Sequence, residues 1–205
     1  MITLTKPAPH LQTSIDSTLI SRRTTREFED RPIPLDVVGH LLFAGQGEIG
    51  NRRTAPSAGA LYPLRLLLAV RAVDGLDAGL YAYRPEEHGL EQVRPGEISG
   101  ALRDAALEEQ PWIGEAAAVN AIVADTGAAR TTFHEQPPEG RRGERYVYIE
   151  AGAIAQNMHL EATVLKLGAV LVAGFDDGPA ARALGLEENL DPMILFCVGS
   201  PKSAS

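Results

Sequence analysis

Apolar residues recur at helical spacing in two long segments of the chain. From Leu35 to Phe43 they lie three or four positions apart, which is typical of one face of a helix. From Arg145 to Leu167, the longest predicted helix, they are spread around several faces. We therefore expect this helix to be buried on more than one side, as a central or an interface helix would be. Shorter helices are predicted at 14–21, 102–107 and 178–184.

Runs of apolar residues without helical spacing predict β-strands. They lie at Leu66–Val73, Gly79–Tyr83, Leu90–Val93, Ala116–Ala124, Gly168–Val172 and Met193–Val198. Helical segments interleaved with these strands predict an α+β or α/β fold with a mixed sheet. At 205 residues the chain is most simply one domain, 1–205, with residues 1–12 as a loose lead-in broken by Pro7 and Pro9.

One stretch follows neither pattern. Residues 125–144 are polar, include Pro137, Pro138 and Gly140, and show no clear period. A loop this long inside a compact domain is usually functional or disordered. We therefore regard it as a possible lid over a site.

A loop with the sequence APSAGALYPL precedes the strand-like run LRLLLAV. Pro56 fixes one backbone dihedral, and Ser57 can cap the backbone N–H groups that follow it. The side chains of Ala58, Gly59 and Ala60 are small or absent, so a flat or charged ligand could lie against the backbone of this loop. A bare loop beside a buried strand is a good place to hold a cofactor.

A glycine-rich segment, GQGEIG from Gly45 to Gly50, matches the dinucleotide-binding pattern G-x-G-x-x-G. That pattern carries its meaning only where a strand precedes it and a helix follows it. Here a predicted helix precedes it, and the loop NRRTAPS follows it. The glycines are therefore interpreted as a helix end and a flexible turn.

The chain is acidic, with a formal net charge of −8 and an isoelectric point near 5.1. This balance argues against a general binder of nucleic acid or of anionic membranes. No apolar run approaches the roughly 18 residues of a membrane span, and no secretory signal is visible. The single cysteine, Cys197, lies in the apolar run MILFCV and predicts a buried structural thiol. We therefore expect a cytoplasmic protein in a reducing compartment.

Several catalytic patterns are absent from the sequence. It contains no HExxH motif and no Cys/His cluster at metal-ligand spacing, so no metal site is expected. It also lacks a GxSxG nucleophile elbow and a Walker A loop. The histidines are scattered, and each is interpreted as a surface or hydrogen-bonded residue rather than a catalyst: His10, His40, His88, His134 and His159.

Three arginines in five residues, Arg22, Arg23 and Arg26, form a dense cationic patch in this acidic chain. Guanidinium groups bind phosphate in bidentate fashion, and Thr24 and Thr25 add hydroxyl groups beside them. The alternative is an exposed turn in which the arginines pair with nearby carboxylates. Those carboxylates are Glu27, Glu29 and Asp30. Composition alone leaves both interpretations open.

A second candidate for ligand binding follows the predicted strand at 168–172. In LVAGFDD the strand ends in a break of small residues, whose backbone N–H groups could face a ligand. An ordinary strand-to-helix turn has the same pattern, so spacing does not decide between the two.

Five segments, in this order along the chain, resemble the nitroreductase superfamily and in particular its azoline-dehydrogenase (SagB-type) branch. They are SRRTTREF, APSAGALYPL, GLYAYRPEEHGL, RYVYIEAGAIAQNMHLEA and GAVLVAGF. The resemblance runs from about Ser21 to Pro201. It implies an α+β fold with a mixed sheet flanked by helices. It also implies an obligate homodimer with long helices at the interface and FMN between the two subunits.

The resemblance further implies which residues contact FMN. The phosphate, the ribityl chain and the pyrimidine edge would be held by Arg22, Arg23, Thr24 and Arg26. The segment that passes along the flavin, partly from the partner subunit, would be Pro56, Ser57, Ala58, Gly59 and Ala60. Backbone N–H groups near the hydride-carrying nitrogen would come from Val172, Ala173 and Gly174. Gln110 and Lys202 are further candidates for cofactor binding.

The sequence departs from this branch at one place. Azoline dehydrogenases resemble one another in a Lys-Tyr pair before the long helix, where this chain has Pro138 and Glu139. The departure argues against azoline oxidation. Glu139 or His134 could replace the missing base, or the 125–144 stretch could be only a lid.

Together these features predict an FMN-dependent oxidoreductase with ping-pong hydride transfer through the flavin. NAD(P)H is the candidate donor, and a nitroaromatic, a quinone or a similar small molecule is the candidate acceptor. The alternatives are a flavin-dependent dehydrogenase of a natural-product or peptide intermediate, and a non-catalytic flavin-binding partner subunit. A weaker alternative is a phosphate-ligand sensor that uses only the arginines. No catalytic side chain is identified, because the flavin carries the chemistry.

Overall fold

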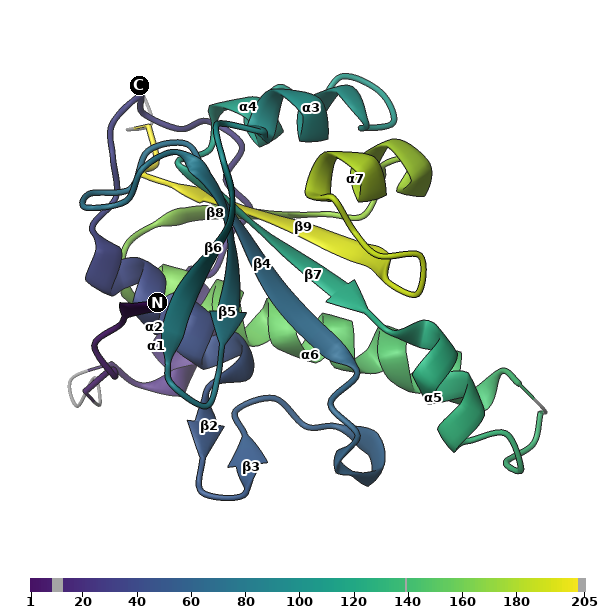
Figure 1. Cartoon of the computed structure of the whole chain (residues 1–205). Helices are drawn as coiled ribbons and strands as arrows, with labels where there is room; N and C mark the ends of the chain where they lie inside the picture. The colour runs from purple at the N-terminus through teal and green to yellow at the C-terminus, as the bar shows by residue number, and fades with distance from the viewer. Residues whose placement is uncertain (9–12, 139, 203–205) are drawn as a thin grey trace.

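The computed structural model of the chain describes residues 1–8, 13–138 and 140–202. A seven-stranded sheet crosses the molecule in the order β1-β6-β5-β4-β7-β9-β8 (Figure 1). Its strands are β1 (Ile2–Thr3), β4 (Leu64–Val70), β5 (Gly79–Arg84), β6 (Gly89–Pro95), β7 (Ala118–Ala124), β8 (Gly168–Val172) and β9 (Asp191–Gly199). A separate short hairpin is formed by β2 (Glu48–Ile49) and β3 (Arg52–Arg53).

Neighbouring strands of this sheet run antiparallel at each described pairing, which differs from the mixed sheet expected from the sequence. Helices interleaved with strands predict a mixed sheet. However, β4, β5 and β6 follow one another without an intervening helix, and short connections favour antiparallel pairs. The α+β class itself is as expected.

Helices cover both faces of the sheet (Figure 1). One face carries α1 (Ile15–Ser21), α2 (Leu35–Gln46) and α6 (Arg142–Val164), and the other carries α3 (Ser99–Asp104), α4 (Trp112–Glu115) and α7 (Asp177–Leu184). Two further elements lie outside these layers: the 3₁₀ turn η1 (Ala58–Ala60) before β4, and α5 (Thr126–Thr132) after β7. Each face of the sheet has its own cluster of buried apolar side chains, so the core consists of two layers.

Strand β7 separates the two layers, and all of its residues are buried. Ala118 and Ile122 belong to the cluster that includes α2 and α6 residues. Val119 and Val123 belong to the cluster on the other face. This alternation is the two-residue period of a strand, and burial on both faces explains why every residue of the segment except Asn120 is apolar.

Helix α6 confirms the longest predicted helix, but one side of it is exposed in the single chain. Its buried residues run from Gly143 to Ala162 and form one stripe with helical spacing. Tyr148 and Ile149, outside this stripe, are 62% and 61% exposed. The expectation of burial on several sides is therefore wrong for the isolated chain. The neighbouring helix α1 also exposes apolar residues, which are Ile15, Leu19 and Ile20.

Two segments expected to be irregular form regular structure. Ile2–Thr3, in the expected lead-in, pairs with β6, whereas residues 9–12 lie outside the described part of the chain. The polar stretch 125–144 contains α5, which begins where the Asp125 side chain accepts a hydrogen bond from the Ala128 N–H. Helix α5 has few apolar residues, so its periodicity is weak and its cap and packing on α6 stabilise it.

The remaining predicted elements lie where the sequence places them, with ends shifted by a few residues. In the Gly45–Gly50 segment, α2 ends at Gln46, Gly47 is its C-cap, and the chain leads into β2, so a helix precedes the segment as expected. Over the described residues, no helix combines the length and apolar character needed to cross a membrane.

Candidate functional site

The arginine-rich segment that follows α1 lies at an edge of the sheet, between β8 and α6. The Thr25 N–H donates to the carbonyl oxygen of Ala169 in β8 at 2.9 Å. The Arg23 carbonyl oxygen accepts a hydrogen bond from Nε2 of His159 in α6 at 3.1 Å. Backbone contacts thus fix the segment, while the residues Arg23 and Arg26 remain exposed.

Two of the three carboxylates near these arginines pair with other arginines, and within the described residues the third, Glu27, forms no ion pair. Glu29 pairs with Arg31 at 2.5 Å, and Asp30 pairs with Arg71 at 2.8 Å. Within the described chain, neither Arg22 nor Arg23 forms an ion pair. The described structure therefore does not show the internally paired turn that the sequence left as an alternative.

The third arginine of the segment stacks on an aromatic ring. The guanidinium carbon of Arg26 lies 5.2 Å from the ring centre of Trp112 in α4, which is a cation–π contact. Lys202 lies beside the same segment, because its backbone N–H donates to the carbonyl oxygen of Glu27 at 3.1 Å. Both cations therefore belong to the same region of the surface as Arg22.

The loop before β4 has an unusual backbone. Gly59, Ala60 and Tyr62 have φ angles of 58°, 53° and 50°. The left-handed region costs a non-glycine residue roughly 1–2 kcal/mol, so surrounding contacts must hold Ala60 and Tyr62 there. The ring of Phe133, at the end of α5, lies over the loop, 3.5 Å from where a Cβ on Gly59 would be.

A buried carboxylate from α6 contacts this loop. Glu150 is 5% exposed, and it accepts hydrogen bonds from the Ala58 N–H at 2.7 Å and from the Ser57 hydroxyl. The Ser57 oxygen accepts in turn from the Tyr62 N–H at 2.8 Å, so Ser57 caps a following donor as expected. Burial raises the pKa of Glu150, and its two hydrogen bonds oppose that rise.

We expect Glu150→Gln to change how stability depends on pH. Because the pKa of Glu150 is raised from its ordinary value of 4.5 by burial, the folded chain retains a proton that the unfolded chain has lost. The stability that this group contributes is full below pH 4.5 and falls as the pH rises through the raised pKa. Glutamine does not titrate. As the pH rises from 4.5 through the raised pKa of Glu150, the free energy of unfolding of the variant should therefore increase relative to that of the native chain. Above the raised pKa this difference should stay constant.

Urea denaturation of both chains from about pH 4 to about pH 8 measures this difference. Glu144→Gln is the matched control, because Glu144 lies on the same helix but pairs with Arg130 at the surface. A stability difference that stays constant over the whole range would contradict the raised pKa of Glu150.

Gln110 fixes the turn between β8 and α7. Its Nε2 donates to the carbonyl oxygens of Leu107 at 2.9 Å and Gly174 at 2.8 Å. The Leu107 N–H donates to the same Gly174 oxygen at 2.9 Å. The amide protons of Gln110 are thus used by backbone carbonyl groups, one of them in the turn that follows Val172, and its Oε1 could accept from a ligand.

A groove of about 520 Å³ opens beside this turn, within the size range of small-molecule sites. Its apolar lining residues are Ala151, Ala173, Phe175, Met193 and Ile194. Its charged lining residues are Arg130, Asp177 and Asp191, and Tyr148 from α6 lines it as well. The groove therefore offers a surface of mixed polar and apolar character next to the strand end that the sequence marked as a candidate.

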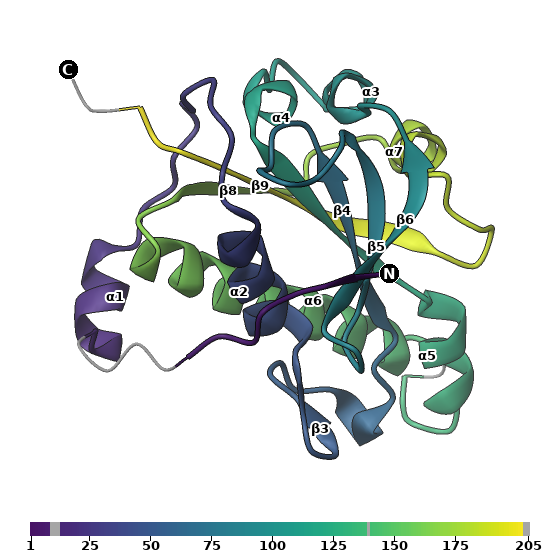
Figure 2. The same cartoon turned by 60° about the vertical axis from the view of Figure 1, so that its left-hand side comes forward.

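A single chain does not bring all the candidate residues together. The arginine segment contacts α6 at His159 and the loop contacts it at Glu150, which lie roughly 13 Å apart at about 1.5 Å per helical residue. Figure 2 shows α1 and α5 at opposite ends of α6.

We call the two groups the arginine half-site and the loop half-site. The arginine half-site comprises Arg22, Arg23, Thr24, Arg26 and Lys202. Strand β8 runs from this half-site to a further group of candidates, Gln110, Val172, Ala173 and Gly174. The loop half-site comprises Pro56, Ser57, Ala58, Gly59 and Ala60.

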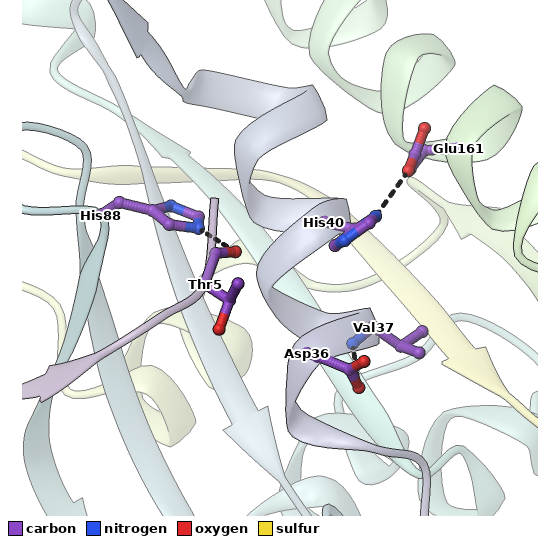
Figure 3. Close-up of polar contacts among 6 residues, drawn as sticks. All are labelled: Thr5, Asp36, Val37, His40, His88 and Glu161. Carbon is purple, nitrogen blue, oxygen red and sulfur yellow. Dashed lines mark hydrogen bonds and ion pairs between the residues drawn. The ribbon is translucent and has the colours of Figure 1, made fainter. Parts of the chain in front are cut away.

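Two histidines, one buried and one partly buried, link elements of the fold. In Figure 3, Nε2 of His88 donates to the Thr5 carbonyl oxygen at 3.1 Å. Nδ1 of the same ring therefore accepts from the Tyr83 hydroxyl at 2.8 Å. Burial lowers the pKa of His88. The same view shows Nδ1 of His40 in α2 facing Oε1 of Glu161 in α6 at 3.2 Å. These contacts agree with the interpretation of the histidines as hydrogen-bonded residues.

The remaining candidates from the sequence are the cysteine, a metal site and the residues that could replace the missing base. Cys197 is fully buried and burial raises the pKa of its thiol, which confirms its structural interpretation. In the described ranges, no three His, Cys, Asp or Glu side chains lie together as metal ligands would. His134 is exposed beside Glu135, while His10 and Glu139 lie outside the described residues.

Glu150 is the main residue that sequence reasoning missed. It lies on the buried stripe of α6 with Val147 and Ile154, and a charged residue at such a position needs a partner. Helical periodicity could therefore have marked it as unusual. Its partner Ala58, however, is 92 positions away, and periodicity carries no information about so distant a contact.

Residues 19–200 match the pattern of the Nitroreductase family. A protein of Methanocaldococcus jannaschii, provisionally named a nitroreductase, is 38% identical over 187 residues, which are 90% of this chain and 90% of that protein. The Escherichia coli microcin B17-processing protein McbC is 26% identical over 155 residues, which are 72% of this chain and 54% of McbC.

The fold is shared with a crystal structure from Ralstonia eutropha that is also provisionally named a nitroreductase. It matches with a TM-score of 0.82 and 30% identity, over 99% of this chain and 90% of that chain. The similarity therefore includes both half-sites and the sheet that carries them.

Proposed function

The chain belongs to the nitroreductase family, whose members are flavin-type oxidoreductases, and we propose that it is an FMN-dependent oxidoreductase. The observation that carries this proposal is the pair Arg22 and Arg23, cations without a carboxylate partner in the described chain, at the edge of β8. Guanidinium groups bind phosphate through paired charge-assisted hydrogen bonds. A phosphate-bearing cofactor suits this site better than an uncharged ligand.

Other residues also fit FMN. The loop half-site presents small side chains, so a flat ring system could lie against its backbone. Arg26 carries a positive charge that would stabilise negative charge at the pyrimidine edge. Ala173 is exposed at the end of β8, where backbone groups are accessible. FMN, when bound, supplies the hydride and electron transfer, and the protein supplies binding, orientation and electrostatics.

We further propose that a second copy of the chain completes the site. The two half-sites are separated along α6 in one chain, and apolar side chains are exposed on both α1 and α6. Burying these side chains in a symmetric interface removes apolar surface from water. Such a dimer would place the loop half-site of one subunit opposite the arginine half-site of the other.

NAD(P)H as donor and a nitroaromatic, a quinone or a similar small molecule as acceptor are the proposed substrates. The groove beside the β8–α7 turn has the volume for such a molecule, and apolar side chains form part of its lining. Hydride transfer does not require an acid–base side chain, which fits the absence of a recognisable catalytic triad in the sequence.

The match to McbC favours a second candidate, a flavin-dependent dehydrogenase that acts on a peptide or natural-product intermediate. Against it stands Pro138, at a position where the azoline dehydrogenases that the sequence resembles have one member of a Lys-Tyr pair. His134 is exposed and could act as a base only if a substrate reached it. A non-catalytic flavin-binding subunit would show neither activity.

Absorption spectra of the protein with FMN, recorded without oxygen before and after NADPH is added, distinguish these functions. We expect flavin bands that bleach, which identifies a reductase. Bands that persist would instead favour the dehydrogenase or the non-catalytic subunit. A protein that takes up no FMN would overturn the proposed function.

A further inference from the structure

Glu150 is a carboxylate buried on the side of α6 that packs against the sheet. It is 5% exposed, and in the described part of the chain no arginine, lysine or histidine pairs with it. Removing a carboxylate from water without a cation is unfavourable. An apolar residue there would extend the buried stripe of α6, so core stability does not explain a glutamate at this position.

The hydrogen bonds of Glu150 go to the loop half-site. It accepts from the Ala58 N–H at 2.7 Å and from the Ser57 hydroxyl, and Ser57 accepts from the Tyr62 N–H. Gly59 and Ala60, which have positive φ angles, lie between these donors. Glu150 therefore connects both sides of the strained turn to a long helix.

The two ends of the loop differ in their other contacts. At the far end, the Arg53 N–H donates to the Tyr62 hydroxyl at 3.2 Å, and the Arg53 guanidinium lies 4.8 Å from the centre of the Tyr62 ring. At the near end, the described hydrogen bonds of the Ala58 N–H and the Ser57 hydroxyl to groups outside the loop are those to Glu150. The carboxylate is thus the anchor of the segment that the proposed function places against the flavin.

We propose that Glu150 is a positioning residue for the cofactor, and that it holds the loop half-site in the conformation that receives FMN. This inference rests on the proposed function, because it assumes that the loop contacts the flavin. A loop that is already ordered binds its ligand without the entropic cost of being ordered on binding. Loss of the anchor should therefore weaken FMN binding.

The affinity for FMN, measured from flavin fluorescence, tests this inference. Glu150→Ala removes both acceptors and should raise the dissociation constant by about tenfold. Glu150→Gln retains one oxygen for the Ala58 N–H and should recover part of this loss. Ser57→Ala should weaken binding less than Glu150→Ala, and the double variant should bind like Glu150→Ala alone, because the two side chains act through one contact.

Glu144→Gln is the matched control on the same helix and should leave the dissociation constant unchanged. If the native chain and Glu150→Ala bind FMN equally well, this inference is overturned and the proposed function stands. If the native chain binds no FMN, both fail together. Should Glu150→Ala not fold, unchanged affinity in both Glu150→Gln and Ser57→Ala would overturn the inference.

Discussion

Arg22→Ala is expected to raise the dissociation constant for FMN by about tenfold to a hundredfold. The residue is half-buried at the sheet edge, and no carboxylate of the described chain neutralises it. A charge-assisted hydrogen bond contributes about 1.5–3 kcal/mol, and about 1.4 kcal/mol corresponds to a tenfold change in affinity. Titration of the variant with FMN, followed by flavin fluorescence, measures the effect.

Arg31→Ala is the matched control for this prediction. Arg31 is near in sequence but pairs with Glu29, and its side chain is 62% exposed. Its loss should change FMN affinity by less than about twofold, as expected for a surface ion pair. Equal weakening in both variants would show that net charge, and not a phosphate contact of Arg22, determines the affinity. Full FMN occupancy in Arg22→Ala would mean that the site is misplaced.

Gly143→Ala is expected to destabilise the protein by about 3 kcal/mol or more. A Cβ at Gly143 would lie 2.2 Å from the carbonyl oxygen of Ala129 and 2.6 Å from the backbone nitrogen of Arg130. Backbone atoms cannot rotate away as a side chain can, so α5 would have to move off α6. Because α5 ends next to Phe133, which lies over Gly59, the change should also loosen the loop half-site.

Chemical denaturation measures this loss, and Gly100→Ala provides the control. Gly100 is also a helical glycine, but a Cβ there would meet nothing within 4 Å. Replacing it should leave stability unchanged or raise it by up to about 1 kcal/mol, since alanine favours a helix over glycine. If Gly143→Ala were as stable as Gly100→Ala, the close packing of α5 on α6 would be wrong.

The elements that sequence patterns predicted are those whose own residues bury an apolar face. Helix α2 has its apolar residues on one stripe, and β7 is apolar on both faces. Strand β1 was missed because two residues carry no period, and they form a strand only by pairing with β6. Helix α5 was missed because a cap and its packing on α6 stabilise it.

The sequence likewise predicted only part of the candidate site. The arginine segment was visible as a cationic cluster, but only the structure shows that Glu29 and Asp30 pair with Arg31 and Arg71 instead. The resemblance to nitroreductases predicted the family and the α+β fold, both of which are confirmed. The anchoring of the loop by Glu150 depends on a contact between residues far apart in the chain, which no local pattern reports.

The account depends most directly on FMN uptake by the protein. Size-exclusion chromatography of the protein after incubation with FMN, with absorption spectra of the eluted peak, measures bound flavin and oligomeric state together. We predict flavin bands that elute with a dimer, equimolar with the chain. A peak free of flavin after incubation would contradict the proposal that Arg22, Arg23 and the strained loop form a cofactor site.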